Sequence, residues 1–308
     1  MAGNSMIVEA PWLKVGCILG EGPVYDSKNS LLHFVDISEH KVFHVQQNGE
    51  YSVETFEEPI SCLALRKNCA GLACTTSKGF AIIGENSTLS YICKPLPSQD
   101  EPHTRFNDGG CDNEGRFFAG TLWNRERGIT GKLYRYDPAI GICEIVDKGP
   151  FTDSNGLGWS PDGKIFYFTD SLKNIIYAYD YDRGNISNRR IFVDANEKGF
   201  HGTGFCDGLC IDSEGAVWSA RWGGSQIVRF DSAGNVDFKI LFPAVLNVTS
   251  CCFGGPNNDQ LFVTTAHCGA FGGDASGQEK YPDSGHLFRV DLAGRFKGQD
   301  LDGRKFSG

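Results

Sequence analysis

The chain has 308 residues, of which 40% are hydrophobic and 22% charged, and its formal net charge is −9. This is the composition of an ordinary globular protein, and the negative charge argues against nucleic acid or an anionic membrane as the main partner. No apolar run approaches the roughly 18 residues needed to cross a bilayer, and the first residues lack the basic start and long apolar core of a signal peptide. We therefore expect a cytoplasmic protein without a nucleic-acid or membrane partner.

A turn followed by a short β-rich strand recurs along the chain. The six copies are KNSLLHFVD (28–36), CAGLACTTS (69–77), NEGRFFAGT (113–121), DGKIFYFTD (162–170), EGAVWSARW (214–222) and NDQLFVTTA (258–266). A second strand follows each copy, several have a third, and a strand of small residues precedes each unit. Six units of about four strands, at a period of about 40–50 residues, predict an all-β, six-bladed β-propeller with four antiparallel strands per blade.

We expect residues 1–308 to form a single propeller domain. The segment 7–19 reads as a strand before the first unit, and we predict that it completes the last blade, closes the ring and hides the sheet edges. Two stacked β-sandwiches are the alternative architecture.

The 12 cysteines are the other conspicuous feature of the composition. No CxxC pair occurs, so the spacing gives no support for a structural zinc site. We expect most of the cysteines to be free thiols that pack as small apolar residues in a reducing compartment, with disulfides as the alternative.

Alignment of the innermost strands by their apolar alternation places one polar residue at the start of each. Equivalent positions on the inner strands of a propeller converge on the central axis, so we predict that these six side chains meet at one mouth of the channel. They are Glu21, Ser61, Asn107, Asn155, Asp207 and Thr249.

Carboxylates and carboxamides in such a ring are the oxygen donors that hard divalent cations prefer. Glu21, Asn155 and Asp207 would bind such an ion and leave positions open for water or a substrate oxygen. The alternative is a hydrated channel of ordinary polar residues, in which Arg105 and Asp108 provide ion pairing instead.

At these positions the chain resembles the family of regucalcin, the gluconolactonases and the luciferin-regenerating enzyme. The matching motifs are GEGPVYD (20–26), RFNDGGCDNEGRFFAGT (105–121), SNGLGWSPDGKIFYFTDS (154–171), CDGLCIDSEGAVWSA (206–220) and TSCCFGGPNNDQLFVTTA (249–266). The resemblance implies a six-bladed propeller with one divalent metal on its axis, without distinguishing Ca, Mg, Mn, Zn or Fe. It places the metal ligands at Glu21, Asn155 and Asp207, with Asp207 also as general base, and the substrate contacts at Arg105 and Asn107.

Three segments qualify this resemblance. Cys206 stands where most members of the family have proline, and LWNRERG (122–128) stands where some animal members carry acidic residues. The run WSARWGG (218–224) is more similar to bacterial and fungal lactonases that act on pentonolactones or deoxyhexonolactones. Cys206 precedes Asp207 in the strand, so we expect its side chain to point away from the site, with ligation by its thiolate as the less favoured alternative.

The function expected from these features is metal-dependent hydrolysis of a sugar-acid (aldono) lactone, namely a pentonolactone, gluconolactone or deoxyhexonolactone, to the free aldonic acid. The metal would polarise the carbonyl and activate water, and Asp207 would act as the base. Substrate is expected to contact Arg105, Asn107, Trp123, Arg125 and His201. No GxSxG motif is present, so a serine nucleophile is not expected.

The alternatives are a non-enzymatic calcium-binding propeller and a metal-dependent esterase of other esters. The expected partner is a small-molecule sugar lactone, and the expected assembly state is a monomer or a weak homo-oligomer.

Overall fold

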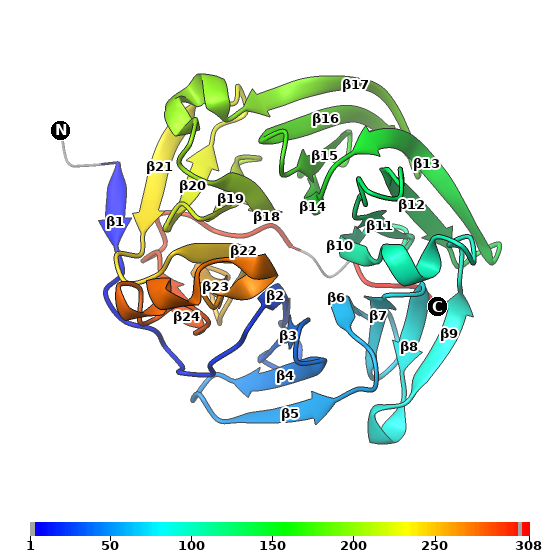
Figure 1. Ribbon diagram of the computed structural model, residues 1–308, viewed down its shortest axis with the longest axis horizontal. Helices are drawn as coiled ribbons and strands as arrows, with labels where there is room; N and C mark the ends of the chain where they lie inside the picture. Colours follow the sequence, from blue (N-terminus) through cyan, green and yellow to red (C-terminus); the bar gives the residue numbers. More distant parts are fainter. Residues whose placement is uncertain (1–3, 301–303) are drawn as a thin grey trace.

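The computed structural model describes residues 4–300 and 304–308 and confirms the six-bladed β-propeller. Six antiparallel sheets surround a central axis, and the first strand of each blade lies at the centre of the disc (Figure 1). These inner strands are β2 (Gly20–Asp26), β6 (Ile60–Leu65), β10 (Phe106–Cys111), β14 (Ser154–Trp159), β18 (Phe205–Ile211) and β22 (Asn247–Gly254).

The remaining strands follow outward in chain order. The second strands are β3 (Leu31–Asp36), β7 (Leu72–Thr76), β11 (Phe117–Thr121), β15 (Ile165–Asp170), β19 (Val217–Trp222) and β23 (Gln260–Ala266). The third strands are β4 (Lys41–Gln46), β8 (Phe80–Ile83), β12 (Gly131–Asp137), β16 (Ile175–Asp182), β20 (Gln226–Phe230) and β24 (Phe288–Asp291). The outer strands of the first five blades are β5 (Tyr51–Thr55), β9 (Leu89–Cys93), β13 (Ile142–Phe151), β17 (Asn185–Asp194) and β21 (Val236–Leu241).

The N-terminal segment is divided between two blades, which refines the expectation of one strand over 7–19. The short strand β1 (Ser5–Ile7) pairs in parallel with β21 at the outer edge of the fifth blade. The chain then bridges Leu13 to Leu287 beside β24, and Cys17 N donates to Gly285 O at 2.7 Å. The sixth blade, which has three strands of its own, is thus completed by residues from the other end of the chain, and this closes the ring.

The hydrophobic core lies between the blades, because each face of a blade packs against its neighbour. The interface of the third and fourth blades is rich in aromatic side chains, among them Phe118, Trp159 and Phe166. Burying each such ring stabilises the fold by about 1.5–3 kcal/mol. Alternation along the inner strands works as expected: in β18, Leu209 faces the fourth blade while Cys210 packs toward the sixth.

All 12 cysteines are free thiols, and most are buried, which confirms their expected use as small packing residues. Among the described residues, helical structure is confined to short turns, at Glu85–Ser87, Glu101–His103, Asn196–Phe200, Ala270–Gly272 and Ala275–Glu279. None of these turns is long and apolar enough to cross a membrane.

Candidate functional site

A cavity of about 330 Å³ opens at the end of the axis where the inner strands begin. Four of the six predicted axial residues line it, namely Glu21, Asn107, Asn155 and Asp207, and each of these side chains is more than nine-tenths buried. The remaining lining residues are Leu19, Leu122, Asp153, Ser171, Leu172, Phe205, Trp222 and Phe271.

A register shift of one residue occurs in every inner strand, at the axial position in five of them and directly after it in β2. In β14 the shift lies between Ser154 and Leu157, and in β18 it lies between Cys206 and Leu209. The other four inner strands shift in the same way, which was not anticipated from the sequence. A β-bulge re-aims the side chain that it carries, so the repeated bulge provides a common reason for the axial orientation of these residues.

Glycine after two of the axial residues allows neighbouring blades to approach closely. A Cβ atom on Gly156 would lie 2.2 Å from the backbone nitrogen of Leu209 and 2.9 Å from the carbonyl oxygen of Asp207. A Cβ atom on Gly208 would likewise lie 2.2 Å from the hydroxyl of Ser250 on the next blade. The motifs NGL and DGL therefore bring the strands of Asn155 and Asp207 into direct contact at the axis.

Asn155 presents an unsatisfied oxygen at this site. Its Nδ2 donates to the Ser171 hydroxyl at 3.0 Å, which fixes the orientation of the carboxamide. Its Oδ1 is buried and has no hydrogen-bond partner within residues 4–300 and 304–308. Because nearly all buried polar atoms in native proteins are paired, this carboxamide oxygen, which lines the same cavity as two carboxylates, is available to bind a ligand.

The two axial carboxylates lie in an environment that opposes their charge. Burial raises the pKa of Glu21 to about 8, with a further contribution from Asp108, against a hydrogen bond at 3.0 Å from the Gly22 amide. Burial also raises the pKa of Asp207 well above its ordinary range, and Glu21, Asp108 and Asp153 add to the shift. A bound cation would reverse this effect by stabilising the ionised forms.

Two further carboxylates surround the axial pair. Burial raises the pKa of Asp108 to about 6, and it raises the pKa of Asp153 to about 6 although Arg105 opposes the shift. Asp153 lines the cavity and was not predicted from the sequence; its place two residues before Asn155, in the turn that enters β14, was the available signal.

Arg105 and Asn107 form a bonded pair at the edge of the site. The Arg105 guanidinium donates to Asn107 Oδ1 at 2.6 Å and to the Phe106 carbonyl at 2.9 Å, and Asn107 Nδ2 donates to the Ser154 carbonyl at 2.9 Å. Burial lowers the pKa of Arg105 to about 10, against the attraction of Glu21 and Asp153, so the guanidinium remains a cation at neutral pH. The structure thus joins the two residues that the resemblance assigns to substrate.

Ser61 and Thr249 do not line the cavity, which corrects the expectation that all six axial residues meet there. Ser61 Oγ lies 2.9 Å from Thr75 Oγ1 within its own blade. Thr249 Oγ1 donates to the Gly20 carbonyl at 2.6 Å, directly before Glu21. These short hydroxyl side chains form hydrogen bonds with groups next to them, whereas the longer axial side chains reach the cavity.

Four of the five predicted substrate contacts do not line the cavity. Arg105 and Trp123 border a separate groove beside Thr104 and Asn124, and both Arg125 and His201 are exposed on loops. The described lining of the axial cavity includes none of the four, although Arg105 reaches its edge through the bond to Asn107. Trp222, in contrast, does line it.

Cys206 points away from the axial cavity, as its place in the strand predicts. Its sulfur accepts a hydrogen bond at 2.9 Å from the buried guanidinium of Arg221, which also donates to Asn174 Oδ1 at 2.9 Å. Burial raises the pKa of the Cys206 thiol, with Arg221 opposing the shift. A buried, protonated thiol on this side of the strand is not a ligand for an axial ion.

The axial residues fit a hard divalent cation. Glu21 and Asp207 supply carboxylate oxygens, and Asn155 Oδ1 supplies a neutral oxygen that the protein leaves unpaired. No three His, Cys, Asp or Glu side chains of the described chain form a metal-binding group, so an axial ion would need Asn155 as its third protein ligand. Three oxygen ligands leave coordination positions for water and substrate.

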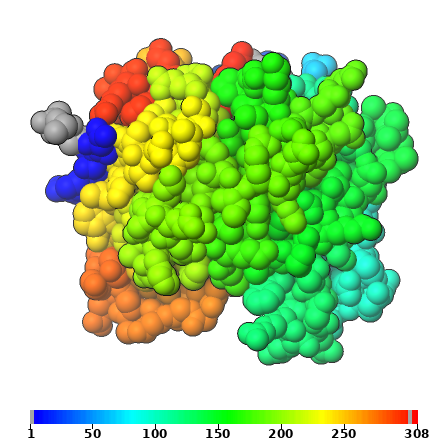
Figure 2. Space-filling model, turned by 90° about the horizontal axis from the view of Figure 1, so that it is seen from above, coloured from blue at the N-terminus to red at the C-terminus, as the bar shows by residue number. Residues whose placement is uncertain are grey.

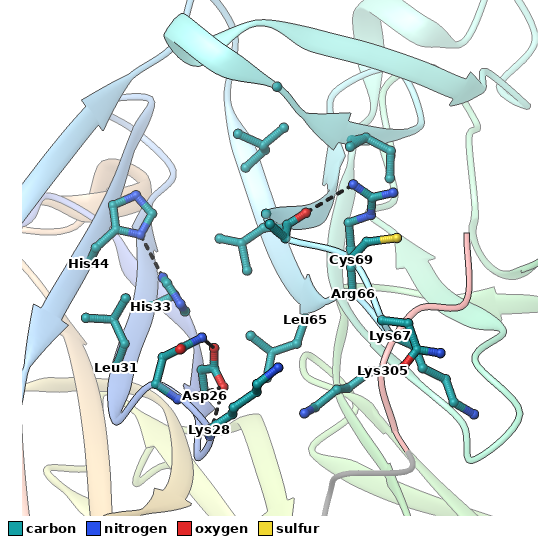
Figure 3. A pocket seen from close by; sticks show the side chains of 18 of the residues that line it. Asp26, Lys28, Leu31, His33, His44, Leu65, Arg66, Lys67, Cys69 and Lys305 are labelled. Atoms are coloured by element: carbon teal, nitrogen blue, oxygen red, sulfur yellow. Dashed lines mark hydrogen bonds between the residues drawn. The ribbon is translucent and has the colours of Figure 1, made fainter.

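A larger cavity, of about 1470 Å³, lies between the first and second blades (Figure 3). His33 and His44 face each other on its wall with their Nδ1 atoms 2.7 Å apart, and His44 Nε2 lies 3.0 Å from Glu54 Oε1. Burial, followed by the effect of His44, lowers the pKa of His33 to about 4. None of the axial residues lines this groove.

Comparisons with known proteins agree with this geometry. Residues 19–267 match the family model described as "SMP-30/Gluconolactonase/LRE-like region". Regucalcin of Xenopus laevis is 32% identical over 292 residues, covering 90% of this chain and 94% of that protein.

Two solved structures resemble the whole fold. The luciferin-regenerating enzyme superposes with a TM-score of 0.82 at 28% identity, over 95% of this chain and 96% of that one. A calcium-binding regucalcin of Agrobacterium tumefaciens superposes with a TM-score of 0.83 at 23% identity, over 96% and 99% of the two chains. With the family model spanning all six inner strands, the chain belongs to the SMP-30/gluconolactonase/LRE-like family.

Proposed function

We propose that this protein is a metal-dependent lactonase that opens an aldonolactone to the free acid at the axial cavity. The family supports a lactonase-type function, and the side chains that line the axial cavity support the same chemistry independently. The observation on which the proposal depends is the orphaned Oδ1 of Asn155 beside the buried carboxylates of Glu21 and Asp207.

Glu21, Asn155 and Asp207 would hold the ion. A divalent cation bound there supplies Lewis acidity toward a carbonyl oxygen and lowers the pKa of a bound water. Asp207 lies in the cavity wall and would take the proton from the attacking water as general base. The Arg105 cation would stabilise negative charge that develops on the substrate oxygen.

Ser171 and Asn107 have positioning roles in this scheme. Ser171 holds the Asn155 carboxamide so that its oxygen faces the cavity. Asn107 holds the Arg105 guanidinium at the edge of the site through a bond of 2.6 Å. Fixed donors of this kind need no rearrangement as charge develops, which is the condition for electrostatic catalysis.

A non-enzymatic calcium-binding role is the second candidate. It is favoured by the oxygen-only donor set, which suits Ca²⁺, and by the solved relative that is itself named a calcium-binding protein. Both candidates predict metal binding, and only the first predicts turnover.

The experiment is lactone hydrolysis by the purified protein before and after chelation, with add-back of Ca²⁺, Mg²⁺, Mn²⁺ and Zn²⁺ in turn. We expect D-glucono-δ-lactone and pentono-γ-lactones to be opened only when a divalent cation is present. Glu21→Gln should abolish the metal dependence together with the activity, whereas Glu54→Gln, in the groove between the first two blades, should retain both. Full activity after chelation would contradict the proposal, and metal binding without turnover of any lactone would favour the second candidate.

A further inference from the structure

The mouth of the axial cavity carries a concentration of exposed apolar side chains. Leu172, Phe205 and Phe271 are 43%, 39% and 69% exposed, and all three line the cavity. Among the described residues, most of the other exposed large hydrophobic side chains lie on outer strands or at the edge of the disc. Scattered apolar residues are normal on a surface, whereas a group gathered around one opening indicates a binding surface.

Three neighbouring blades contribute an apolar residue from equivalent places at the cavity. Leu122 directly follows β11, Leu172 lies two residues after β15, and Trp222 is the last residue of β19. The polar lining residues other than Ser171, by contrast, lie on or next to the inner strands. The cavity therefore has a polar floor at the axis and apolar walls toward solvent.

Phe271 completes these walls from the sixth blade. Its ring centroid lies 5.9 Å from that of Trp222 at an interplanar angle of 71°, and 5.8 Å from the Arg105 guanidinium carbon. Edge-to-face and cation–π contacts of this kind hold the exposed ring over the opening. The segment around residues 267–281, orange in Figure 2, projects from the same face of the disc as the blue-green segment of the third blade.

The backbone at Phe271 is unusual for an aromatic residue. Its φ is 52°, in the left-handed region, and glycines stand at 269, 272 and 273 on either side of it. A bulky residue in this conformation carries strain, and strain that persists in an exposed loop is a frequent feature of ligand-binding segments. The strained residue is therefore the same one whose ring lies over the cavity, which supports a role for Phe271 in binding.

Several polar groups near the mouth are already bonded to one another or to the backbone. Asn107 uses Oδ1 on Arg105 and Nδ2 on the Ser154 carbonyl, while Ser171 receives the Asn155 amide. A polyhydroxylated substrate would therefore place hydroxyl groups against Leu122, Leu172, Phe205 and Phe271, where they would lose their bonds to water.

We infer that the site prefers lactones that carry an alkyl or aryl substituent, with the ring at the polar floor and the substituent against Phe271, Trp222 and Leu172. This rests on the proposed metal-dependent lactonase activity, and it assigns to the same site a preferred substrate class other than the aldonolactones. In the reaction, a water oxygen bonds to the carbonyl carbon and the acyl C–O bond breaks. The ring oxygen leaves as an alcohol after taking a proton, and the product is a hydroxy acid.

The test compares kcat/KM for three δ-lactones on the metal-loaded protein: unsubstituted δ-valerolactone, alkyl-substituted δ-decalactone and D-glucono-δ-lactone. We expect δ-decalactone to exceed each of the others by about tenfold or more, since single methylenes in apolar pockets already discriminate on this scale. Phe271→Ser and Leu172→Ser should each reduce the ratio of δ-decalactone to δ-valerolactone. Ile191→Ser, which alters an exposed side chain on the outer strand β17, is the matched control and should leave the ratio unchanged.

A binding measurement separates failure of this inference from failure of the proposed function. The δ-lactams that correspond to δ-decalactone and δ-valerolactone resist hydrolysis, and calorimetry reports their affinities directly. Tighter binding of the alkyl-substituted lactam, weakened in Phe271→Ser, supports the inference even if no lactone is turned over. Equal affinities, no binding of either lactam, or a preference for D-glucono-δ-lactone that persists in both mouth variants would overturn it.

Discussion

The axial cavity and the groove between the first two blades differ in how their polar groups are satisfied. The groove is the larger, at about 1470 Å³ against about 330 Å³. Two of its carboxylates are paired: Glu54 accepts from His44 and Ser87, and Asp26 accepts from the backbone and side chain of Asn29. At the axis, in contrast, Glu21 and Asp207 are buried together beside an unpaired oxygen of Asn155.

Cavity size is therefore a poor guide to the site in this protein. Buried charged groups without a partner are the better guide. A carboxylate buried without a partner destabilises the fold unless a bound ligand neutralises its charge. The groove needs no such ligand to account for its side chains. The predictions below test this difference by altering one region and using the other as the control.

The largest effect is expected for Asp207→Asn. Removing a general base that also binds the metal should lower kcat on lactones by about 10³-fold, within the range typical of acid–base catalysis. The variant should fold, since the side-chain shape is retained and a buried charge is removed. Steady-state kinetics with circular dichroism measure both points, and the groove variant Glu54→Gln should keep wild-type kcat. A folded Asp207→Asn protein with wild-type turnover would contradict the assignment.

The second-largest effect is expected for the pH dependence of folding stability, which involves His33 in the groove. The folded pKa of His33 is lowered to about 4, so in this range the unfolded chain binds the proton more readily than the folded protein. Stability from this group is complete above about pH 6.5 and falls as the pH approaches 4, by up to about 3 kcal/mol. Denaturant unfolding at pH 7 and pH 4.5 should show a smaller loss in His33→Gln than in the wild type.

The control for this pH effect is His201→Gln, because His201 is exposed and should leave the wild-type loss unchanged. If His33→Gln loses as much stability as the wild type on acidification, the His33–His44 contact does not behave as the structure indicates. Lactone turnover at pH 7 should be the same in both variants, since neither residue lines the axial cavity.

Ser171→Ala tests how the axial carboxamide is positioned. The loss of the 3.0 Å hydrogen bond frees Asn155 to rotate, and we expect metal affinity to fall by about tenfold, as for other residues that orient metal ligands. The free energy of unfolding without metal should change by only about 1 kcal/mol. Calorimetric metal titration measures the affinity, with Ser87→Ala, which removes the equivalent contact to Glu54, as the groove control. Unchanged metal affinity in Ser171→Ala would show that Ser171 does not position the Asn155 carboxamide for metal binding.

The smallest effect is expected for Cys206→Ala. The Cys206 sulfur bonds Arg221 on the side of β18 away from the cavity, so metal affinity should be unchanged. The loss of this buried contact should lower the free energy of unfolding by about 1 kcal/mol. A tenfold change in metal affinity would show instead that Cys206, which stands where most members of the family have proline, affects the metal site.

Most of the residues of the site that could be predicted from the sequence were found from the register of the inner strands. Apolar alternation in the inner strands identified Glu21, Asn107, Asn155 and Asp207, because the period of two fixes which side chain begins each strand. The same reasoning could not separate these from Ser61 and Thr249. Whether a side chain reaches the axis depends on its length and its local hydrogen bonds, which the pattern does not encode.

The rest of the cavity depends on contacts between blades and on loop geometry. Asp153 and Ser171 reach it from turns, and Phe271 reaches it from a glycine-flanked segment with positive φ. Trp123, Arg125 and His201 were predicted as substrate contacts from their loops, yet the backbone directs them elsewhere. Loop conformation is set by such local turns and not by hydrophobic periodicity, so a single sequence does not determine it.

The most direct test of the central claim is a divalent-cation titration of the chelated protein, followed by its thermal unfolding midpoint and its lactone turnover in the same samples. The wild type and the groove variant Glu54→Gln should gain thermal stability saturably, by about 2.7 kcal/mol at a hundredfold excess over Kd, and should gain turnover over the same concentration range. Glu21→Gln should gain neither. Equal stabilisation of Glu21→Gln and the wild type, or turnover that is independent of the cation, would contradict the account.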